Sequence, residues 1–212
     1  MIKAVFFDVD GTLVDSDRPI VVAVQKAFVE AKLPKPTQGQ VLKFVGYSLI
    51  DWIDLVLREL DLRGDPRSIA QNALVHLQVY LDKHGNVTPG TKSTLEALKK
   101  RGVKLFIISN GPRKSIVLGL KHAGLLKFFQ AVMGFEQMAM PKPHPESLVN
   151  TMKKLNLKKS ECLYVGDTDI DTTYAKRAGV KFALLRHSRN SNIRADFKLK
   201  KLTDLIAVVR KC

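Results

Sequence analysis

The sequence is short of acidic residues, of cysteine and of long hydrophobic runs, and each shortage excludes a class of protein. Its only two cysteines, Cys162 and Cys212, lack the spacing of a metal site, which favours a reducing, cytoplasmic location. No apolar run approaches the roughly 20 residues that a membrane-spanning helix needs. The apolar stretch near the N-terminus is short and ends at Asp8, so we expect no signal peptide. We therefore expect a cytoplasmic protein without a membrane partner.

The shortage of acid leaves a net charge of +15, from 35 basic and 20 acidic side chains. Residues 15–87 contain nine of each kind, so the whole excess lies in the rest of the chain. Five of the remaining acids stand in two short motifs, as Asp8, Asp10, Asp167, Asp169 and Asp171. A positive field attracts phosphorylated metabolites, nucleic acid or anionic lipid. Solubility alone explains the charge equally well, so the charge does not distinguish an anionic ligand from a solubilising role.

Outside residues 15–87, short apolar runs alternate with helical patterns. Five runs are typical of buried strands, at 4–7, 103–108, 131–135, 162–166 and 182–185. Helical patterns follow the later turns and end near residues 100, 122, 155 and 178. Strands that alternate with helices indicate right-handed βαβ units and a parallel sheet. The runs lack polar alternation, which suits strands that are covered on both faces.

Residues 15–87 read differently, as a helical segment. Apolar residues recur at helical spacing in three groups: Val21, Val24 and Phe28; Ile50, Ile53 and Leu57; and Ile69, Ala73, Leu77 and Leu81. No strand is expected between residues 17 and 84. We therefore predict an α/β protein in which residues 1–14 and 88–212 form a Rossmann-like parallel sheet core. Residues 15–87 form an all-helical domain inserted after the first strand.

Polar side chains follow three of the predicted strands. Asp8 and Asp10 end the first, Ser109 and Asn110 follow the second, and Asp167 follows a later one. In open α/β sheets, ligands bind at the carboxyl ends of the strands. The coincidence of three polar strand ends therefore predicts a binding site at this edge.

Asp8 and Asp10 are two residues apart, so in extended chain their side chains point the same way. Two carboxylates on one face repel, and a cation or a shared proton has to hold them. An Asx-turn or a helix cap is the alternative, but one aspartate would suffice for it.

The run Asp167, Asp169 and Asp171 matches positions 1, 3 and 5 of an EF-hand calcium loop. Thr172 and Ala178 stand where that loop needs glycine and glutamate, so calcium is excluded. A few carboxylates with open coordination suit Mg²⁺ instead. N-capping of the next helix accounts for one of the three aspartates, but not for all.

Ser109, Asn110 and Lys142 are candidates for holding an anion. At a strand end, the Ser109 hydroxyl and the Asn110 N–H group can bind a phosphate oxygen. Lys142 stands between prolines in PKPHP, which fix the backbone around one positive charge. The alternatives are a helix cap and an exposed lysine in a proline loop.

Four motifs in order carry a family resemblance: DVDGT at 8–12, SNG at 109–111, KPHPE at 142–146 and GDTDID at 166–171. Together they resemble the motifs of the haloacid dehalogenase (HAD) superfamily. The helical segment resembles the C1 cap of that superfamily, and the match covers nearly the whole chain. The resemblance implies the HAD fold and enzymatic activity.

The resemblance also implies roles for these residues. Asp8 attacks phosphorus and becomes an aspartyl-phosphate, while Asp10 protonates the leaving oxygen and then activates water. Ser109 and Lys142 hold the phosphoryl group, with the Asn110 N–H beside them.

A Mg²⁺ cofactor is implied as well. Its ligands are Asp8, the backbone carbonyl of Asp10, and Asp167, and Asp171 supports the metal or Lys142. Because Mg²⁺ and a lysine offset charge during phosphoryl transfer, this set is chemically consistent.

Within the superfamily, dehalogenases lack the second aspartate, so the presence of Asp10 favours phosphoryl transfer. The chain resembles phosphoglycolate phosphatases and β-phosphoglucomutases. The mutases carry a histidine about where this chain has Ile20. Its absence here favours a phosphatase that acts on a small phosphorylated metabolite, such as a phosphoglycolate-like compound. A β-phosphoglucomutase-like mutase is the alternative.

A rival from another class is a nucleic-acid-binding protein on a HAD scaffold. The basic runs 153–159 and 198–201 suit contacts with a phosphate backbone. No aromatic stacking motif or recognition helix accompanies them, which disfavours a nucleic acid partner.

Overall fold

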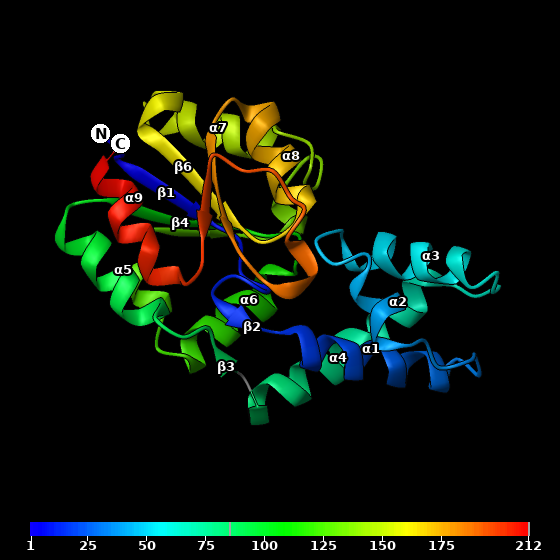
Figure 1. Cartoon of the computed structure of the whole chain (residues 1–212). Coiled ribbons are helices and arrows are strands. Elements are labelled where there is room, and N and C mark those ends of the chain that lie inside the picture. The colour runs from blue at the N-terminus through cyan, green and yellow to red at the C-terminus, as the bar shows by residue number, and fades with distance from the viewer. Residues whose placement is uncertain (85, 212) are drawn as a thin grey trace.

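The computed structural model describes residues 1–84 and 86–211; Gly85, next to the predicted domain boundary, and Cys212 lie outside them. An α/β body and a smaller group of helices lie next to each other (Figure 1). The body contains a six-stranded parallel sheet with the strand order β5-β4-β1-β6-β7-β8. This confirms the predicted α/β fold with a parallel sheet.

The sheet strands are β1 (Ala4–Phe7), β4 (Lys104–Ile108), β5 (Ala131–Met133), β6 (Cys162–Gly166), β7 (Lys181–Leu185) and β8 (Phe197–Leu199). The helices of the body are α5 (Thr91–Lys100), α6 (Arg113–His122), α7 (Glu146–Lys154), α8 (Asp169–Ala178) and α9 (Leu205–Lys211). The predicted strands all form. The short strand β8 and helix α9 were not predicted, because a three-residue strand and a seven-residue helix carry little periodic pattern.

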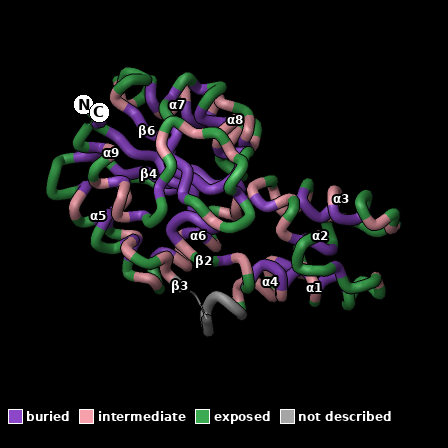
Figure 2. The backbone as a smooth tube through the Cα atoms, in the orientation of Figure 1, coloured by how far each residue is buried: buried purple, intermediate pink, exposed green. Residues whose placement is uncertain are grey.

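Successive residues of each strand enter opposite faces of the sheet. Val5 and Phe7 of β1 join a core with α5, α6 and α9, whereas Ala4 and Phe6 join a core with α7 and α8. Both faces are therefore covered, and the strands are buried at their centre (Figure 2). This explains why the buried positions of β1, β4 and β7 are apolar, whereas Lys104 and Lys181 stand at the exposed first positions of β4 and β7.

The helical segment has a hydrophobic core of its own. It comprises α1 (Asp17–Glu30), α2 (Gln38–Leu42), α3 (Leu49–Glu59) and α4 (Pro66–His84). Phe28, Trp52, Ile53 and Ala73 belong to its buried cluster. The short helix α2 was not predicted; Thr37 and Gln40 form a capping box at its start.

Two short strands lie at the ends of this segment. Val14–Asp15 (β2) pairs antiparallel with Asn86–Val87 (β3), and Val14 faces Val87. Because this pairing brings the two connecting segments together, the chain enters and leaves the helical segment at one place. Strands of two residues leave no alternation in the sequence, so neither was predicted.

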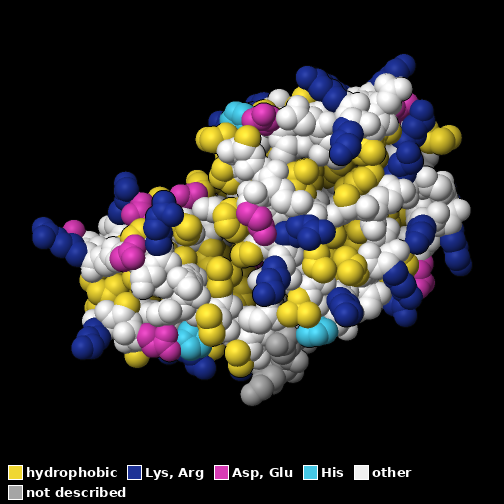
Figure 3. All heavy atoms as spheres, turned by 180° about the vertical axis from the view of Figure 1, so that it is seen from behind, with side chains coloured by type: hydrophobic (Ala, Val, Ile, Leu, Met, Phe, Trp, Pro, Cys, Tyr) yellow, Lys and Arg dark blue, Asp and Glu magenta, His cyan; other side chains and the backbone are white. Residues whose placement is uncertain are grey.

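Among the described residues, none of the helices combines the length and the apolar character that crossing a bilayer requires. Seen from behind, lysine and arginine side chains spread over the surface of the larger body, and acidic ones are fewer (Figure 3). This agrees with the location of the charge excess in the sequence.

Candidate active site

The central strands β4, β1 and β6 are neighbours, and their carboxyl ends bring three polar loops together. Asp8 follows β1, Ser109 follows β4 and Asp167 follows β6. All three residues are buried. The parallel pairing thus places residues that are far apart in the sequence at one edge of the sheet.

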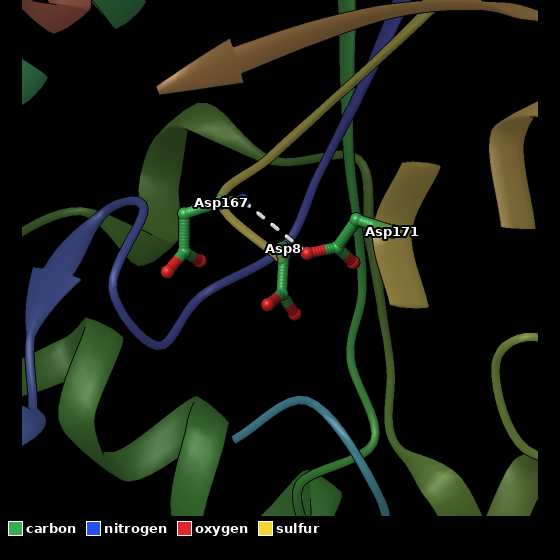
Figure 4. A group of neighbouring side chains, drawn as sticks. All are labelled: Asp8, Asp167 and Asp171. Atoms are coloured by element: carbon green, nitrogen blue, oxygen red, sulfur yellow. Dashed lines mark hydrogen bonds between the residues drawn. The ribbon is translucent and has the colours of Figure 1, made fainter. Parts of the chain in front are cut away.

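Three carboxylates form a cluster at this edge. Asp8, Asp167 and Asp171 each offer an oxygen, and these oxygens lie within 4.8 Å of one another. Figure 4 shows them around a common space, with the backbone N–H of Asp167 donating to Oδ2 of Asp171 at 3.3 Å. Burial and the neighbouring charges of Asp171 and Asp10 raise the pKa of Asp8 to about 7, although Lys142 opposes the shift. Burial likewise raises the pKa of Asp167 well above its usual value, although Arg189 opposes the shift.

Lys142 lies inside this cluster. Its Nζ is 2.9 Å from Oδ1 of Asp8, donates to Oδ1 of Asp171 at 2.7 Å and donates to the Tyr164 hydroxyl at 3.1 Å. Burial opposes the charged amine, but Asp171 and Asp8 outweigh it and hold the pKa of Lys142 well above its usual value. The side chain is 1% exposed, so its charge is fixed in place.

Asp171 is fully occupied by its neighbours. Oδ1 accepts from Lys142, while Oδ2 accepts the Thr168 hydroxyl at 2.6 Å and the backbone N–H groups of Thr168 and Asp167. Thr168 and Asp171 form the capping box of α8. A Cβ at Gly166 would lie 2.5 Å from Cγ of Asp171, so glycine is required there. Asp171 therefore positions Lys142 and the start of α8.

The carboxylate of Asp10 is not part of the three-carboxylate cluster that the described residues form. It lines the cavity next to Asp8. Burial raises its pKa, although the charge of Lys142 opposes the shift. A carboxyl group with a raised pKa retains its proton more readily, which suits a proton donor.

Ser109 and Asn110 contribute in different ways. The Ser109 hydroxyl lines the cavity and accepts the backbone N–H of Gly111 at 3.1 Å. The Asn110 side chain donates to the carbonyl oxygens of Gly46 at 2.8 Å and Lys142 at 2.9 Å, and accepts the Lys142 N–H at 2.8 Å. Asn110 therefore joins the Lys142 loop to the helical segment. Only its backbone N–H is left for the predicted phosphate contact.

Two residues that were not predicted hold Asp167. Thr12 donates to Oδ1 at 3.1 Å, and Arg189 donates through Nη2 to Oδ2 at 2.6 Å. Thr12 stands in the DVDGT motif, which is the one signal that pointed to it. Arg189 also pairs with Asp17 in the first turn of α1. It follows β7 in a single 3₁₀ turn, Ser188–Asn190, and no sequence pattern marks this turn.

A cavity of about 320 Å³ opens beside these residues. Asp8, Asp10, Ser109 and Lys142 lie in its lining, together with residues of α1, α3, α4 and α6. The site thus lies between the sheet edge and the helical segment. A bound molecule of that size would contact both parts.

Comparison with known proteins places this arrangement in a family. The haloacid dehalogenase-like hydrolase family matches residues 5–185. A phosphoglycolate phosphatase of Pseudomonas syringae pv. tomato is 34% identical over 89% of this chain and 71% of its own length. Pyrophosphatase PpaX of Listeria monocytogenes is 31% identical over 99% of this chain and 97% of its own.

Solved structures agree in fold. A predicted phosphoglycolate phosphatase from Haemophilus somnus has a TM-score of 0.88 and 25% identity, with 98% of this chain and 97% of that one covered. A β-phosphoglucomutase from Clostridium difficile has a TM-score of 0.84 at 20% identity, covering 100% and 96%. The match to the family spans most of the chain and confirms the resemblance that the four motifs predicted. The chain therefore belongs to the haloacid dehalogenase-like hydrolase family.

Proposed function

We propose that this hydrolase is a phosphatase that releases inorganic phosphate from small phosphomonoesters through an aspartyl-phosphate on Asp8. The observation that carries the proposal is the position of Asp8. Its carboxylate lies at the cavity, with the buried Lys142 ammonium 2.9 Å away. An anionic nucleophile beside a fixed cation suits attack on an anionic phosphoryl group. The names of the relatives support the same chemistry.

Two steps account for the reaction. One oxygen of Asp8 attacks phosphorus, the bond to the leaving oxygen breaks, and its electron pair stays on that oxygen. Asp10 gives the leaving oxygen a proton. Water then attacks the phosphorus of the aspartyl-phosphate, and Asp10 takes a proton from this water. The bond between phosphorus and the Asp8 oxygen breaks, its electron pair returns to the Asp8 carboxylate, and inorganic phosphate leaves. The raised pKa of Asp10 fits the first of these roles.

The cluster fits a Mg²⁺ ion. Oδ1 of Asp8 is buried and accepts no well-aligned hydrogen bond from the described residues, and burial raises the pKa of Asp8 to about 7 even with Lys142 nearby. A second cation would keep this carboxylate ionised. We propose Asp8, Asp167 and the Asp10 carbonyl as ligands, with Asp171 supporting them through Lys142. When bound, Mg²⁺ would offset the charge on the phosphoryl oxygens.

Ser109 and Lys142 would hold the phosphoryl group, and the backbone N–H of Asn110 would assist. Lys142 lies in the lining of the cavity while it bonds to Asp171, so its charge is already oriented. This orientation removes the cost of ordering a flexible lysine at each turnover.

We also propose that residues 15–87 form a separate cap domain. We further propose that the protein is located in the cytoplasm, where the buried Cys162 would stay reduced.

A phosphate-release assay tests the proposal. A panel of phosphomonoesters is supplied with Mg²⁺ and with EDTA, to the wild type and to Asp8→Asn. We expect phosphate release that EDTA abolishes and that Asp8→Asn lacks while it stays folded by circular dichroism. Undiminished turnover by Asp8→Asn would show that Asp8 is not the nucleophile. Unchanged turnover in EDTA would show that the reaction does not need Mg²⁺.

Mutase chemistry is the second candidate, because β-phosphoglucomutases share the fold. Ile20 lines the cavity near the start of α1 and carries no titratable group. A mutase would need a group there to move protons on a sugar. The named relatives include a phosphoglycolate phosphatase and a pyrophosphatase, so the substrate class has to come from the cavity of this chain.

A further inference from the structure

The part of the cavity lining that comes from helices α1, α3, α4 and α6 is largely apolar. Ile20 and Val24 of α1, Trp52 of α3, Leu74 and Leu77 of α4, and Leu120 of α6 contribute to it. The indole N–H of Trp52 donates to the carbonyl of Val41 at 2.6 Å, so the tryptophan has no free donor for a ligand. This wall is where the leaving group of a phosphomonoester would lie once its phosphorus is at Asp8.

The side chains that the helical segment contributes to this wall, among those that the structure describes, are uncharged. Among the described lining residues between 15 and 87, none is aspartate, glutamate, lysine, arginine or histidine. Lys142 also lines the cavity, and it is paired with Asp8 and Asp171. His122 of α6 also lines the cavity, and it already has an interaction partner. Among the described lining residues, the wall therefore offers a leaving group no lysine or arginine other than the paired Lys142.

A charged leaving group would be poorly accommodated here. The glycolate part of phosphoglycolate carries a carboxylate, and the leaving half of pyrophosphate carries a second phosphate. Burying either against an apolar wall removes its hydration without supplying a partner. The carboxylates of Asp8 and Asp10 add repulsion from the floor of the cavity. An apolar leaving group meets neither cost and gains from burial.

We infer that the cavity selects phosphomonoesters whose leaving group is uncharged and largely apolar, an alkyl or aryl alcohol. This inference rests on the proposed phosphatase function and narrows it. It separates the chain from the two relatives whose printed names give charged substrates, phosphoglycolate and pyrophosphate. A cavity of 320 Å³ has room for an alcohol of several carbons beside the phosphoryl group.

Matched esters test the inference. Isobutyl phosphate and phosphoglycolate have leaving groups of similar size and the same branching, because two methyl groups replace the two carboxylate oxygens. We expect kcat/KM to be at least about tenfold higher for isobutyl phosphate. The kcat/KM should also rise about fifteenfold from ethyl to butyl phosphate, since each of the two added methylenes contributes roughly fourfold when it is buried. A preference for phosphoglycolate over isobutyl phosphate would overturn the inference.

A charge placed in the wall supplies a second test. Leu74 lines the cavity, whereas the adjacent Val75 of α4 is 60% exposed and does not line it. Leu74→Lys should shift the ratio of kcat/KM toward phosphoglycolate by at least about tenfold. Val75→Lys carries the same charge on the same helix and should leave the ratio at its wild-type value. Equal effects of the two variants would show that the wall does not determine selection.

Binding separates this inference from the proposed function. Isobutylphosphonate and phosphonoacetate lack the ester oxygen and resist hydrolysis, and they differ from each other as the two esters do. Calorimetry measures their affinities for the wild-type protein with Mg²⁺ present. We expect tighter binding of isobutylphosphonate. If no ester releases phosphate, the phosphatase proposal fails, and this comparison still decides the preference of the wall. Tighter binding of phosphonoacetate would contradict the inference whether or not the protein is a phosphatase.

Discussion

Arg189 donates from Nη2 to Oδ2 of Asp167 at 2.6 Å, and its other terminal nitrogen pairs with Asp17 at the start of α1. Thr12 occupies Oδ1 of the same aspartate. Both carboxylate oxygens of Asp167, which we propose as a metal ligand, thus accept hydrogen bonds. A metal ion at Asp167 has to share or displace one of them. The Arg189 guanidinium therefore stabilises the buried Asp167 carboxylate and competes with a metal ion for it.

Replacement of Arg189 should strengthen metal binding. Arg189→Met keeps much of the side-chain volume and removes the charge, so Mg²⁺ no longer competes with a charge-assisted hydrogen bond. We expect the Kd for Mg²⁺, measured by calorimetry, to fall by about tenfold. Arg186→Met removes an exposed arginine three residues away and should leave the Kd unchanged. A weaker affinity in Arg189→Met would show that the guanidinium helps to hold the ion.

The Asn110 side chain joins two parts of the site, and its loss should affect both. Asn110→Ala removes the bonds to Gly46 and Lys142 and leaves buried backbone groups unpaired. We expect a loss of about 1–3 kcal/mol in the free energy of unfolding. We also expect faster hydrogen exchange around Gly46 and a lower kcat. The exposed Asn150→Ala is the control; unchanged exchange around Gly46 would contradict the proposed link.

The sequence predicted that Asp8, Ser109 and Asp167 would lie at one edge of the sheet, because few physical rules determine this arrangement. Apolar runs that end in Asp8, Ser109 and Asp167 become neighbouring parallel strands, and parallel strands present their carboxyl ends at one edge. The lack of a side chain at Gly166 makes room for Asp171, and the capping box of Thr168 and Asp171 determines where α8 begins. Each of these features is local, so pattern and spacing reveal it.

The contacts that the sequence did not reveal are between distant segments. Asn110 meets Gly46 across 64 residues, and Arg189 meets Asp17 across 172. Neither contact has a motif, since any polar side chain of suitable length can make it. The apolar wall was hidden for the same reason: Val24 and Leu77 resemble ordinary core residues of their helices. Their exposure to a cavity depends on how the helical segment lies against the sheet.

Lys142 should be important for stability as well as for chemistry. Lys142→Met leaves the buried carboxylates of Asp8 and Asp171 without their cation, and we expect a loss of about 3–5 kcal/mol in urea unfolding. Lys142→Met combined with Asp171→Asn removes one of the stranded charges and should recover part of this loss without restoring activity. Lys153→Met, an exposed change, is the control. Equal stability of the single and double variants would contradict the pairing.

The raised pKa of Asp8 predicts how stability depends on pH in the absence of metal. Burial and the neighbouring carboxylates raise this pKa to about 7 in the folded chain, against about 3.9 in an unfolded one. Between these values the folded state keeps a proton that the unfolded state has lost. The free energy of unfolding therefore falls as pH rises from about 4 to 7, by up to roughly 1.4 kcal/mol per pH unit.

Asp8→Asn cannot lose this proton, so it should escape the loss. Measured in EDTA, its unfolding midpoint relative to the wild type should be higher at pH 8 than at pH 4.5. Asp169→Asn changes an exposed carboxylate at the first residue of α8 and should show no such rise. Saturating Mg²⁺ should reduce the difference at pH 8, because an ion that binds the folded wild type offsets the repulsion between its carboxylates. A wild type that gains stability relative to Asp8→Asn as pH rises would mean that Lys142 outweighs burial at Asp8.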